Sequence, residues 1–374
     1  MPNIPPRLKP LVYLLLVVFI FLSSFLTTVI IGKLILSENR ISLSENPSQV
    51  GSFTPPREDD NTVNILLLGY GGAGHDGGGL ADAISIIHID PDHSKAAIIS
   101  LPRDIWVPLP IRSDISQNFK INHAFAIGND DRNYPLKEPL YKSENGGVNM
   151  AKVAVKTVTN LDIDYYVSVD FNSFVNLIDT LGGVTVSVPV TFDDHFYPIK
   201  GEENNPCDFS PEEIAHLSAT LSGFELEKQF ECRYEHLHFD AGTTQMDGAT
   251  ALKFVRSRHS DAHGGDYARH QRQQAVLYAL KDKLVSINAL SKIDQVYADL
   301  SHLVSTNLDV ASVKSFIKSF PNFQNFTVKN IYLNEDNAFN STRTSDGQFA
   351  LIPREGENIW QAIHQLIQKE LTNP

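Results

Sequence analysis

The sequence contains few cysteines and carries no excess of positive charge. Its only two cysteines are Cys207 and Cys232, and no second ligand pair at zinc spacing accompanies them. We therefore expect a disulfide between them rather than a zinc site, in a compartment where disulfides persist. The formal net charge of −13 argues against nucleic-acid binding, which depends on neutralising many phosphates. Any anionic ligand must instead meet a local cluster of basic residues.

Two further absences limit the chemistry. A glycine-rich window at residues 69–82, GYGGAGHDGGGLAD, follows an apolar run, but no Gly-Lys-Ser/Thr comes after it. This argues against a P-loop nucleotidase. No internal repeat is evident, and the histidines lack metal-ligand spacing, so they are interpreted as structural or loop residues: His75, His88, His123, His259 and His263.

One long hydrophobic run stands near the N-terminus. Residues 11–31 carry no charge and, at about 1.5 Å per residue, would cover a hydrocarbon core of roughly 30 Å. Arg7 and Lys9 precede the run without any acidic residue, which places the tail in the cytoplasm and the rest of the chain outside. A secretory signal peptide shares the basic start, but its apolar core is shorter. We therefore expect a single-pass membrane protein with an extracytoplasmic domain.

The composition changes several times along the chain and predicts its organisation. The segment that follows the hydrophobic run is rich in Ser, Glu, Asn and Pro and reads as a linker. The polar segment that holds both cysteines is interpreted as a disulfide-stapled surface insertion. The expected parts are a tail at 1–10, a transmembrane helix at 11–36, a linker at 37–61, a catalytic domain at 62–290 with the insertion at 198–238, and a C-terminal extension at 291–374 that packs on the domain.

The remaining pattern mixes strands and helices. Short apolar runs bounded by Gly, Pro and Asp predict buried strands at residues 62–70, 84–90, 95–101 and 164–169. Residues 171–181 have helical spacing and end at a glycine pair, a C-cap signal, before an alternating strand at 184–190. A strand-like stretch at 327–333 and an amphipathic helix at 360–371 follow later. The pattern predicts an α/β fold in which helices cover a sheet.

The window at residues 254–284 carries the strongest site signal. From Asp266, the residues Arg269 and Gln273 fall on one helical face, and Leu277, Leu280 and Leu284 continue that stripe toward the core. Polar side chains that occupy an inward stripe only in its first turns should line a pocket at the helix N-terminus, where phosphate is favoured. In the alternative, Asp266 is only an N-cap and Arg269 is its partner.

Two more arginines precede this helix. Arg256 and Arg258 are two residues apart, so both point the same way if the segment is extended. Two adjacent guanidiniums repel each other unless an anion lies between them. Together with Arg269 and Arg272 in an acidic protein they predict a diphosphate pocket, because the planar fork of arginine matches phosphate oxygens. A surface salt-bridge face is the alternative.

Three other positions could complete the site. Asp82, with Asp76 beside the glycine-rich turn, could hold Mg²⁺ through carboxylate oxygens. Arg103 and Asp104 directly follow a predicted strand end, a usual place for site residues in α/β sheets. Lys120 could add a cation, although a single lysine is more often solvated.

At these residues the chain resembles the LytR-CpsA-Psr family of bacterial cell envelopes. The resemblance covers about residues 64–280 and rests on the order of many blocks: the glycine-rich loop, LADAISIIHID, SLPRD, KINHAF, IDYYVSVDF, LGGVTVSVP, MDG, VRSR and GDYARHQRQQ. It implies an α/β/α sandwich with a mixed central sheet and an apolar groove for a lipid tail. It also implies a Mg²⁺-dependent transfer of a glycopolymer phosphate from a polyprenyl pyrophosphate carrier to peptidoglycan.

The resemblance also assigns roles to residues. Asp82 would bind Mg²⁺, Asp266 would orient arginines, and the pyrophosphate ligands would be Arg103, Arg256, Arg258, Arg269 and Gln273. This chain departs from the family at two places: Gly71 stands where an Asp is usual, and Leu80 stands where an Arg is usual. Asp76 and Lys120 are the candidates to replace them. Asp104 is the nearest candidate for a general base, and it could equally anchor Arg103.

Two rival functions use the same residues. The first is hydrolysis of the lipid pyrophosphate, with water as the acceptor. The second is a non-catalytic receptor that only binds envelope lipid or polymer.

Overall fold

The computed structural model describes residues 62–75, 77–142, 144–286, 293–310 and 326–372. The expected tail, transmembrane helix and linker lie outside the described residues, and so does Asp76. Within the described ranges, no helix is both long enough and apolar enough to cross a bilayer.

The centre of the molecule is a six-stranded mixed sheet in the order β11-β6-β1-β2-β3-β12. β1 pairs parallel with β6 and antiparallel with β2, β3 is antiparallel to β2, and β12 is parallel to β3. This confirms the predicted mixed α/β class. Its strands are β1 (Val63–Tyr70), β2 (Ala81–Asp90), β3 (Lys95–Leu101), β6 (Tyr165–Asp170), β11 (Ser305–Thr306) and β12 (Thr327–Tyr332).

The central strands form where the sequence is apolar on both faces. In β1, Ile65 and Leu66 are both fully buried although they point to opposite sides of the sheet, so both sides must be covered. β2 begins at Ala81, earlier than the predicted residue 84, because the ladder with β1 continues to the Tyr70–Ala81 pair. Asp82 is therefore a strand residue rather than part of the glycine-rich turn.

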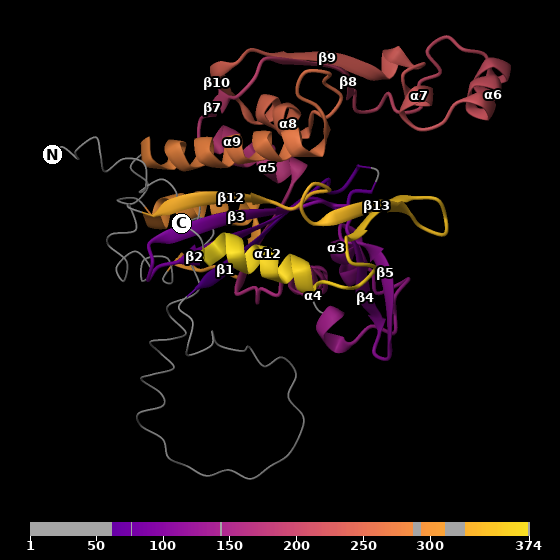
Figure 1. Ribbon diagram of the computed structural model, residues 1–374. Helices are drawn as coiled ribbons and strands as arrows, with labels where there is room; N and C mark the ends of the chain where they lie inside the picture. The colour runs from indigo at the N-terminus through magenta and orange to yellow at the C-terminus, as the bar shows by residue number, and fades with distance from the viewer. Residues whose placement is uncertain (1–61, 76, 143, 287–292, 311–325, 373–374) are drawn as a thin grey trace, which may run out of the picture.

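Helices cover both faces of the sheet (Figure 1). One hydrophobic cluster joins one side of the strands to α5, α8, α9 and α10, and a second joins the other side to α3, α4 and α12. The bounds are α3 (His123–Asn129), α4 (Gly146–Thr159), α5 (Phe171–Thr180), α8 (Gly248–Arg256), α9 (Gly265–Ser286), α10 (Ile293–Leu300) and α12 (Gln361–Thr372). The arrangement is a three-layered α/β/α sandwich.

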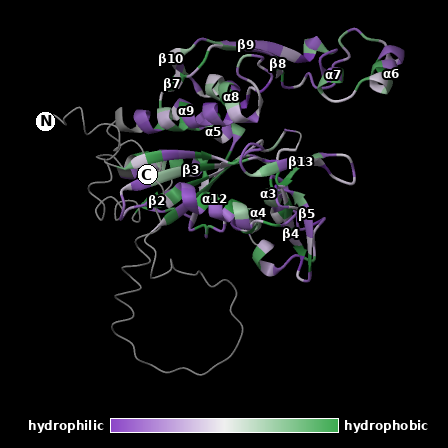
Figure 2. Ribbon diagram, viewed as in Figure 1, coloured by the Kyte–Doolittle hydropathy of each residue, from purple (hydrophilic) through white to green (hydrophobic). Residues whose placement is uncertain are grey.

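Four two-stranded ribbons extend the sandwich. They are β4 (Trp106–Arg112) with β5 (Ile115–Lys120), β7 (Val184–Val188) with β10 (Gly242–Met246), β8 (Phe192–Pro198) with β9 (Tyr234–Phe239), and β13 (Phe339–Arg343) with β14 (Phe349–Pro353). In Figure 2, β9 is coloured largely hydrophilic, in contrast to the greener central strands.

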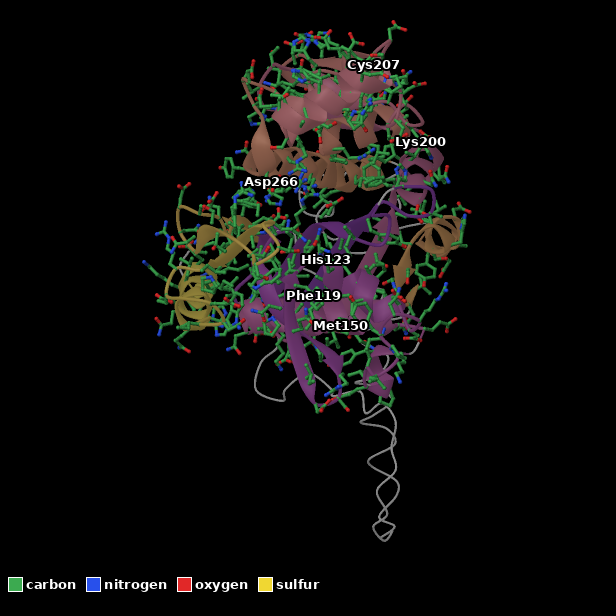
Figure 3. The ribbon with its side chains drawn as sticks, turned by 90° about the vertical axis from the view of Figure 1, so that its right-hand side faces the viewer. Phe119, His123, Met150, Lys200, Cys207 and Asp266 are labelled. Atoms are coloured by element: carbon green, nitrogen blue, oxygen red, sulfur yellow. A yellow bond between two sulfur atoms is a disulfide. The ribbon has the colours of Figure 1, made fainter. Side chains whose placement is uncertain are left out.

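The segment predicted as an insertion is the connection between β8 and β9. It carries α6 (Pro211–Thr220), α7 (Phe224–Glu227) and η3 (Glu231–Arg233), and α6 starts with a Ser210–Glu213 capping box. Cys207 and Cys232 lie at disulfide-bonding distance, with Cα atoms 5.6 Å apart. Figure 3 shows Cys207 at the top of the view, well above His123 and Met150.

The C-terminal part is tied to the rest of the domain. β12 occupies one edge of the central sheet beside β3. On α12, the Nε2 atom of His364 lies 3.0 Å from the carbonyl oxygen of Thr157 in α4. A short helix, η5 (Ser301–Leu303), precedes β11, and η2 (Pro139–Tyr141) precedes α4.

Candidate active site

A cavity of about 390 Å³ lies between strands β1, β2 and β6 of the central sheet and the helices α5, α8 and α9. We call it the arginine pocket. Its polar lining includes six predicted site residues: Asp82, Arg103, Arg256, Arg258, Arg269 and Gln273. Much of its remaining lining is apolar and comes from strands and helices: Leu67, Val167, Val169, Phe174, Leu177, Val255, Val276, Leu277, Leu280 and Val304.

Strand register brings the first two polar residues together. β2 and β3 are antiparallel with Ile84 opposite Leu101, so continuing this register places Arg103 beside Asp82. Their side chains form an ion pair, with Arg103 Nη1 2.5 Å from Asp82 Oδ1. Burial alone would lower the pKa of Arg103, but the Asp82 carboxylate raises it, so this guanidinium stays charged.

Asp104 and Lys120 lie next to this pair. The Asp104 carboxylate is largely buried and lies 2.8 Å from Lys120 Nζ and 3.5 Å from Arg103 Nε. In the described part of the chain, neither Asp104 nor Lys120 is among the residues that line the pocket. The structure therefore brings both residues to the site, but it pairs Lys120 with a carboxylate instead of exposing it in the cavity.

Arg269 projects from the second turn of α9, on the stripe that the sequence predicted. The residue is only 4% exposed, and its Nε and Nη2 atoms have no hydrogen-bond partner among the described residues. Burial lowers the pKa of Arg269 to about 10. A buried guanidinium that lines a cavity and has unsatisfied hydrogen-bond donors is a site for an oxyanion, because leaving buried donors without a hydrogen bond is costly, and here only the ion pair of Nη2 with Asp266 compensates in part.

Asp266 holds two of the arginines. Its Oδ1 atom accepts a hydrogen bond of 2.8 Å from Arg258 Nη2 and lies 3.3 Å from Arg269 Nη2. Burial would raise the pKa of Asp266, but Arg269 and Arg258 lower it, so the carboxylate is ionised. Figure 3 shows Asp266 where the helical layer meets the sheet. Asp266 itself does not line the pocket in the described part of the chain.

Arg256 reaches the pocket by a different route from the one the sequence suggested. The expected extended segment is wrong for this residue, because amphipathic α8 buries Ala251 and Phe254 and continues through Arg256. The Arg256 guanidinium lies over the Phe171 ring at 4.3 Å from its centroid and donates to the Tyr197 hydroxyl at 3.1 Å. This contact stacks a cation on an aromatic face.

The residues around Asp82 limit the possible metal ligands. Among the described residues there is no group of three or more His, Cys, Asp or Glu side chains placed to hold a metal ion. At Gly71 an added Cβ would lie 3.1 Å from the Cβ of His75 and 3.2 Å from the Cα of Gly78, so the loop closes tightly where the family usually has an aspartate. The Asp82 side chain is 38% exposed and is the one predicted ligand within the described residues.

This donor set still fits a magnesium ion bound mainly through a substrate. Mg²⁺ is usually held by one or two carboxylates together with phosphate oxygens and water. Asp82 can supply one carboxylate at the cavity wall. Arg103 already neutralises this carboxylate in part through their ion pair.

Several pocket residues had no clear sequence signal. Phe171 and Tyr197 contact Arg256, and the buried Asp194 and the half-buried His259 also line the cavity. The spacing of Phe171, Phe174 and Leu177 on one face of α5 is typical of a core helix and gives no sign of a ligand. Asp194 lies in a polar stretch, and only its tertiary contacts reveal its environment.

Comparisons with known proteins bear on the family and the fold of this chain. The model of the LytR_cpsA_psr family matches residues 26–359. The polyisoprenyl-teichoic acid–peptidoglycan teichoic acid transferase TagU of Oceanobacillus iheyensis is 27% identical over 285 residues, which are 76% of this chain and 71% of TagU. TagV of Bacillus subtilis, a transferase with the same description, is 26% identical over 70% of this chain and 55% of TagV.

Solved structures share the fold. Protein gbs0355 from Streptococcus agalactiae superposes with a TM-score of 0.56 at 21% identity, over 85% of this chain and 90% of that protein. The crystal structure of B. subtilis TagV gives 0.54 at 22% identity, over 84% of this chain and 98% of TagV. At this identity the structural likeness concerns the fold alone. The family match, however, spans most of the sequence, and the chain belongs to the LytR-CpsA-Psr family.

Proposed function

We propose that this protein transfers a glycopolymer phosphate from a polyprenyl pyrophosphate carrier to peptidoglycan. The observation that carries the proposal is the arginine pocket, where four guanidiniums border a largely apolar cavity. A lipid pyrophosphate combines the same two properties, a doubly charged head and a hydrocarbon tail. The names of the related transferases TagU and TagV describe a reaction of this kind.

The reaction follows from placing the two phosphates among the arginines. A peptidoglycan hydroxyl oxygen attacks the phosphorus that carries the glycopolymer. The bond from this phosphorus to the bridging oxygen breaks, and polyprenyl phosphate leaves with the electron pair while the hydroxyl proton passes to a base. Arg103, Arg258 and Arg269 stabilise the negative charge that moves to the leaving phosphate.

We further propose that Asp82 is the protein ligand of a Mg²⁺ ion bound with the substrate. Such an ion supplies Lewis-acid polarisation of the phosphoryl oxygens. Asp82 also orients Arg103 through their ion pair. The carboxylate therefore holds the Arg103 guanidinium beside the phosphate site. Gln273, on the same face of α9 as Arg269, donates its amide N–H groups to phosphate oxygens.

For Asp104 the geometry favours an anchoring role over that of a general base. Two cations bind its carboxylate, and it does not line the pocket within the described residues. Asp104 therefore holds Arg103 and Lys120 in position, and the proton of the acceptor hydroxyl leaves by another route.

We also propose that the enzyme is anchored in the cell membrane by residues 11–36, with its catalytic domain outside. The uncharged run and the basic tail before it support this topology. The paired Cys207 and Cys232 fit an oxidising exterior. Protease added to intact spheroplasts should digest the domain at 62–290, and protection of the domain would contradict the topology.

Product analysis tests the function. Full-length protein in detergent is incubated with Mg²⁺, peptidoglycan and a polyprenyl-pyrophosphate-linked glycopolymer that is radiolabelled in its sugars. Transfer predicts label bound covalently to peptidoglycan, and this product should be absent with Arg258→Ala. Free labelled polymer phosphate would indicate a hydrolase. Unchanged labelled lipid, with binding retained, would indicate a receptor, and either outcome contradicts the proposal.

A further inference from the structure

The segment that carries Arg258 is a short loop between two helices. Residues 257–264, here called the arginine loop, join the end of α8 at Arg256 to the start of α9 at Gly265. A loop has no hydrogen-bond ladder of its own, so its backbone groups need other partners when they are buried. In this loop the partners come from two buried charged side chains, Asp194 and Arg272.

Asp194, on β8, accepts hydrogen bonds from N–H groups of the loop. The residue is 1% exposed, and its Oδ2 atom accepts hydrogen bonds from Ser257 Oγ at 2.6 Å and from the backbone N–H of Arg258 at 2.9 Å. The same oxygen accepts from the N–H of His259 at 3.1 Å, and Oδ1 accepts from the N–H of Phe196 at 3.0 Å. Burial would raise the pKa of Asp194, but these hydrogen bonds lower it, so the carboxylate is ionised.

Arg272, on α9, donates hydrogen bonds to carbonyl groups of the same loop. It is fully buried and donates to the carbonyl oxygens of Ser257 and His263, the latter at 2.7 Å. Its guanidinium also lies over the Phe192 ring of β8, 4.7 Å from the centroid. Asp194 and Arg272 therefore hold opposite polar groups of one loop, and β8 contributes to both contacts.

We propose that Asp194 and Arg272 are positioning residues that fix the arginine loop so that Arg258 points into the pocket. The inference rests on the proposed function, because it takes Arg258 as a ligand of the pyrophosphate. Neither residue has to touch the phosphates. They restrict the loop to one conformation before the ligand binds, so that less conformational entropy is lost on binding.

The chemistry of Asp194 makes the proposal testable by a near-isosteric change. Four donors surround two carboxylate oxygens, and an asparagine would have to turn its NH₂ group toward at least one of these donors. Asp194→Asn should therefore loosen the loop while nearly preserving the size and shape of this side chain in the pocket lining. The matched control is Asp164→Asn: its Oδ2 atom accepts from the backbone N–H of Asn64 at 2.8 Å, and it lies at the other end of β6 from the pocket residue Val169.

The experiment is a double-mutant cycle on full-length protein in detergent, with a short-chain polyprenyl pyrophosphate as the probe. We expect Arg258→Ala to weaken binding at least tenfold, Asp194→Asn to weaken it about fivefold, and the double variant to bind like Arg258→Ala within twofold. Asp164→Asn should bind like the wild type. Melting temperatures are recorded in parallel, and if Asp194→Asn does not fold, Ser257→Ala, which removes only the 2.6 Å hydrogen bond, replaces it in the cycle.

The outcomes separate the two proposals. If Arg258→Ala weakens binding but Asp194→Asn has wild-type affinity, or its effect adds fully to that of Arg258→Ala, the positioning role is refuted and the pocket stands. If Arg258→Ala itself binds with wild-type affinity, the proposed pyrophosphate site is refuted and the inference falls with it.

Discussion

Replacing Arg269 by methionine should improve stability and damage binding at the same time. Burial lowers the pKa of Arg269 from its usual 12.5 to about 10, so the folded protein disfavours this charge. At about 1.4 kcal/mol per pKa unit, this net shift, which already includes the attraction of Asp266, corresponds to a cost on the order of 3 kcal/mol. Methionine keeps most of the buried volume without the charge. We expect a gain of about 1 to 2 kcal/mol in the ligand-free protein.

The same change should remove charged hydrogen bonds to the ligand. Each is worth roughly 1.5 to 3 kcal/mol, so affinity for polyprenyl pyrophosphate should fall about ten- to a hundredfold. Urea unfolding and lipid binding are measured together, with Arg343→Met as the control, because Arg343 is exposed on β13 and outside the pocket. A salt-bridge role for Arg269 predicts lower stability with normal affinity, and that result would refute the reasoning.

Three other changes test separate parts of the structure. Asp82→Asn keeps the size but removes the carboxylate charge, so Mg²⁺-dependent activity and Mg²⁺-induced thermal stabilisation should fall together; unchanged Mg²⁺ dependence would place the ion elsewhere. Burial, and to a lesser extent the charge of Arg269, lowers the pKa of His270 to about 4, below its unfolded value of about 6.5. The unfolded protein therefore binds a proton more readily than the folded protein, and the free energy of unfolding should drop by about 2 kcal/mol as pH falls from 7 to 5. In urea unfolding, the His270→Phe variant should not show this drop in stability. A pH dependence equal to that of the wild type would contradict the prediction. The Cys207–Cys232 bridge has a sequence separation of 25, and Cys207→Ala should destabilise the protein by about 3 kcal/mol in denaturant titrations; an unchanged free energy of unfolding would contradict this.

Local sequence patterns predicted the elements whose burial is uniform. The apolar runs of β1 and β3 are buried on both faces, and on the inward stripe of α9 Arg269 and Gln273 line the cavity together with Leu277 and Leu280, which the sequence placed in the core. These features depend on residues close together in the chain, so periodicity is sufficient to find them.

Features that depend on distant partners were harder to predict. The helical end at Arg256 arises because α8 packs against the core, and Lys120 is paired because Asp104 lies beside it in space. The early start of β2 follows from its ladder with β1. The role of Asp194 depends on a loop more than 60 residues further along the chain. None of these contacts leaves a local pattern in the sequence.

The central claim is that the arginine pocket binds the two phosphates of a lipid carrier. Its most direct test compares the affinity of the full-length protein for polyprenyl pyrophosphate and for polyprenyl monophosphate of the same chain length, at fixed Mg²⁺ and salt. We predict that the pyrophosphate binds at least tenfold more tightly and that Arg258→Lys, which keeps the charge but loses the bidentate fork, reduces this preference. Equal affinity for the two lipids, or an unchanged preference in Arg258→Lys, would contradict the claim.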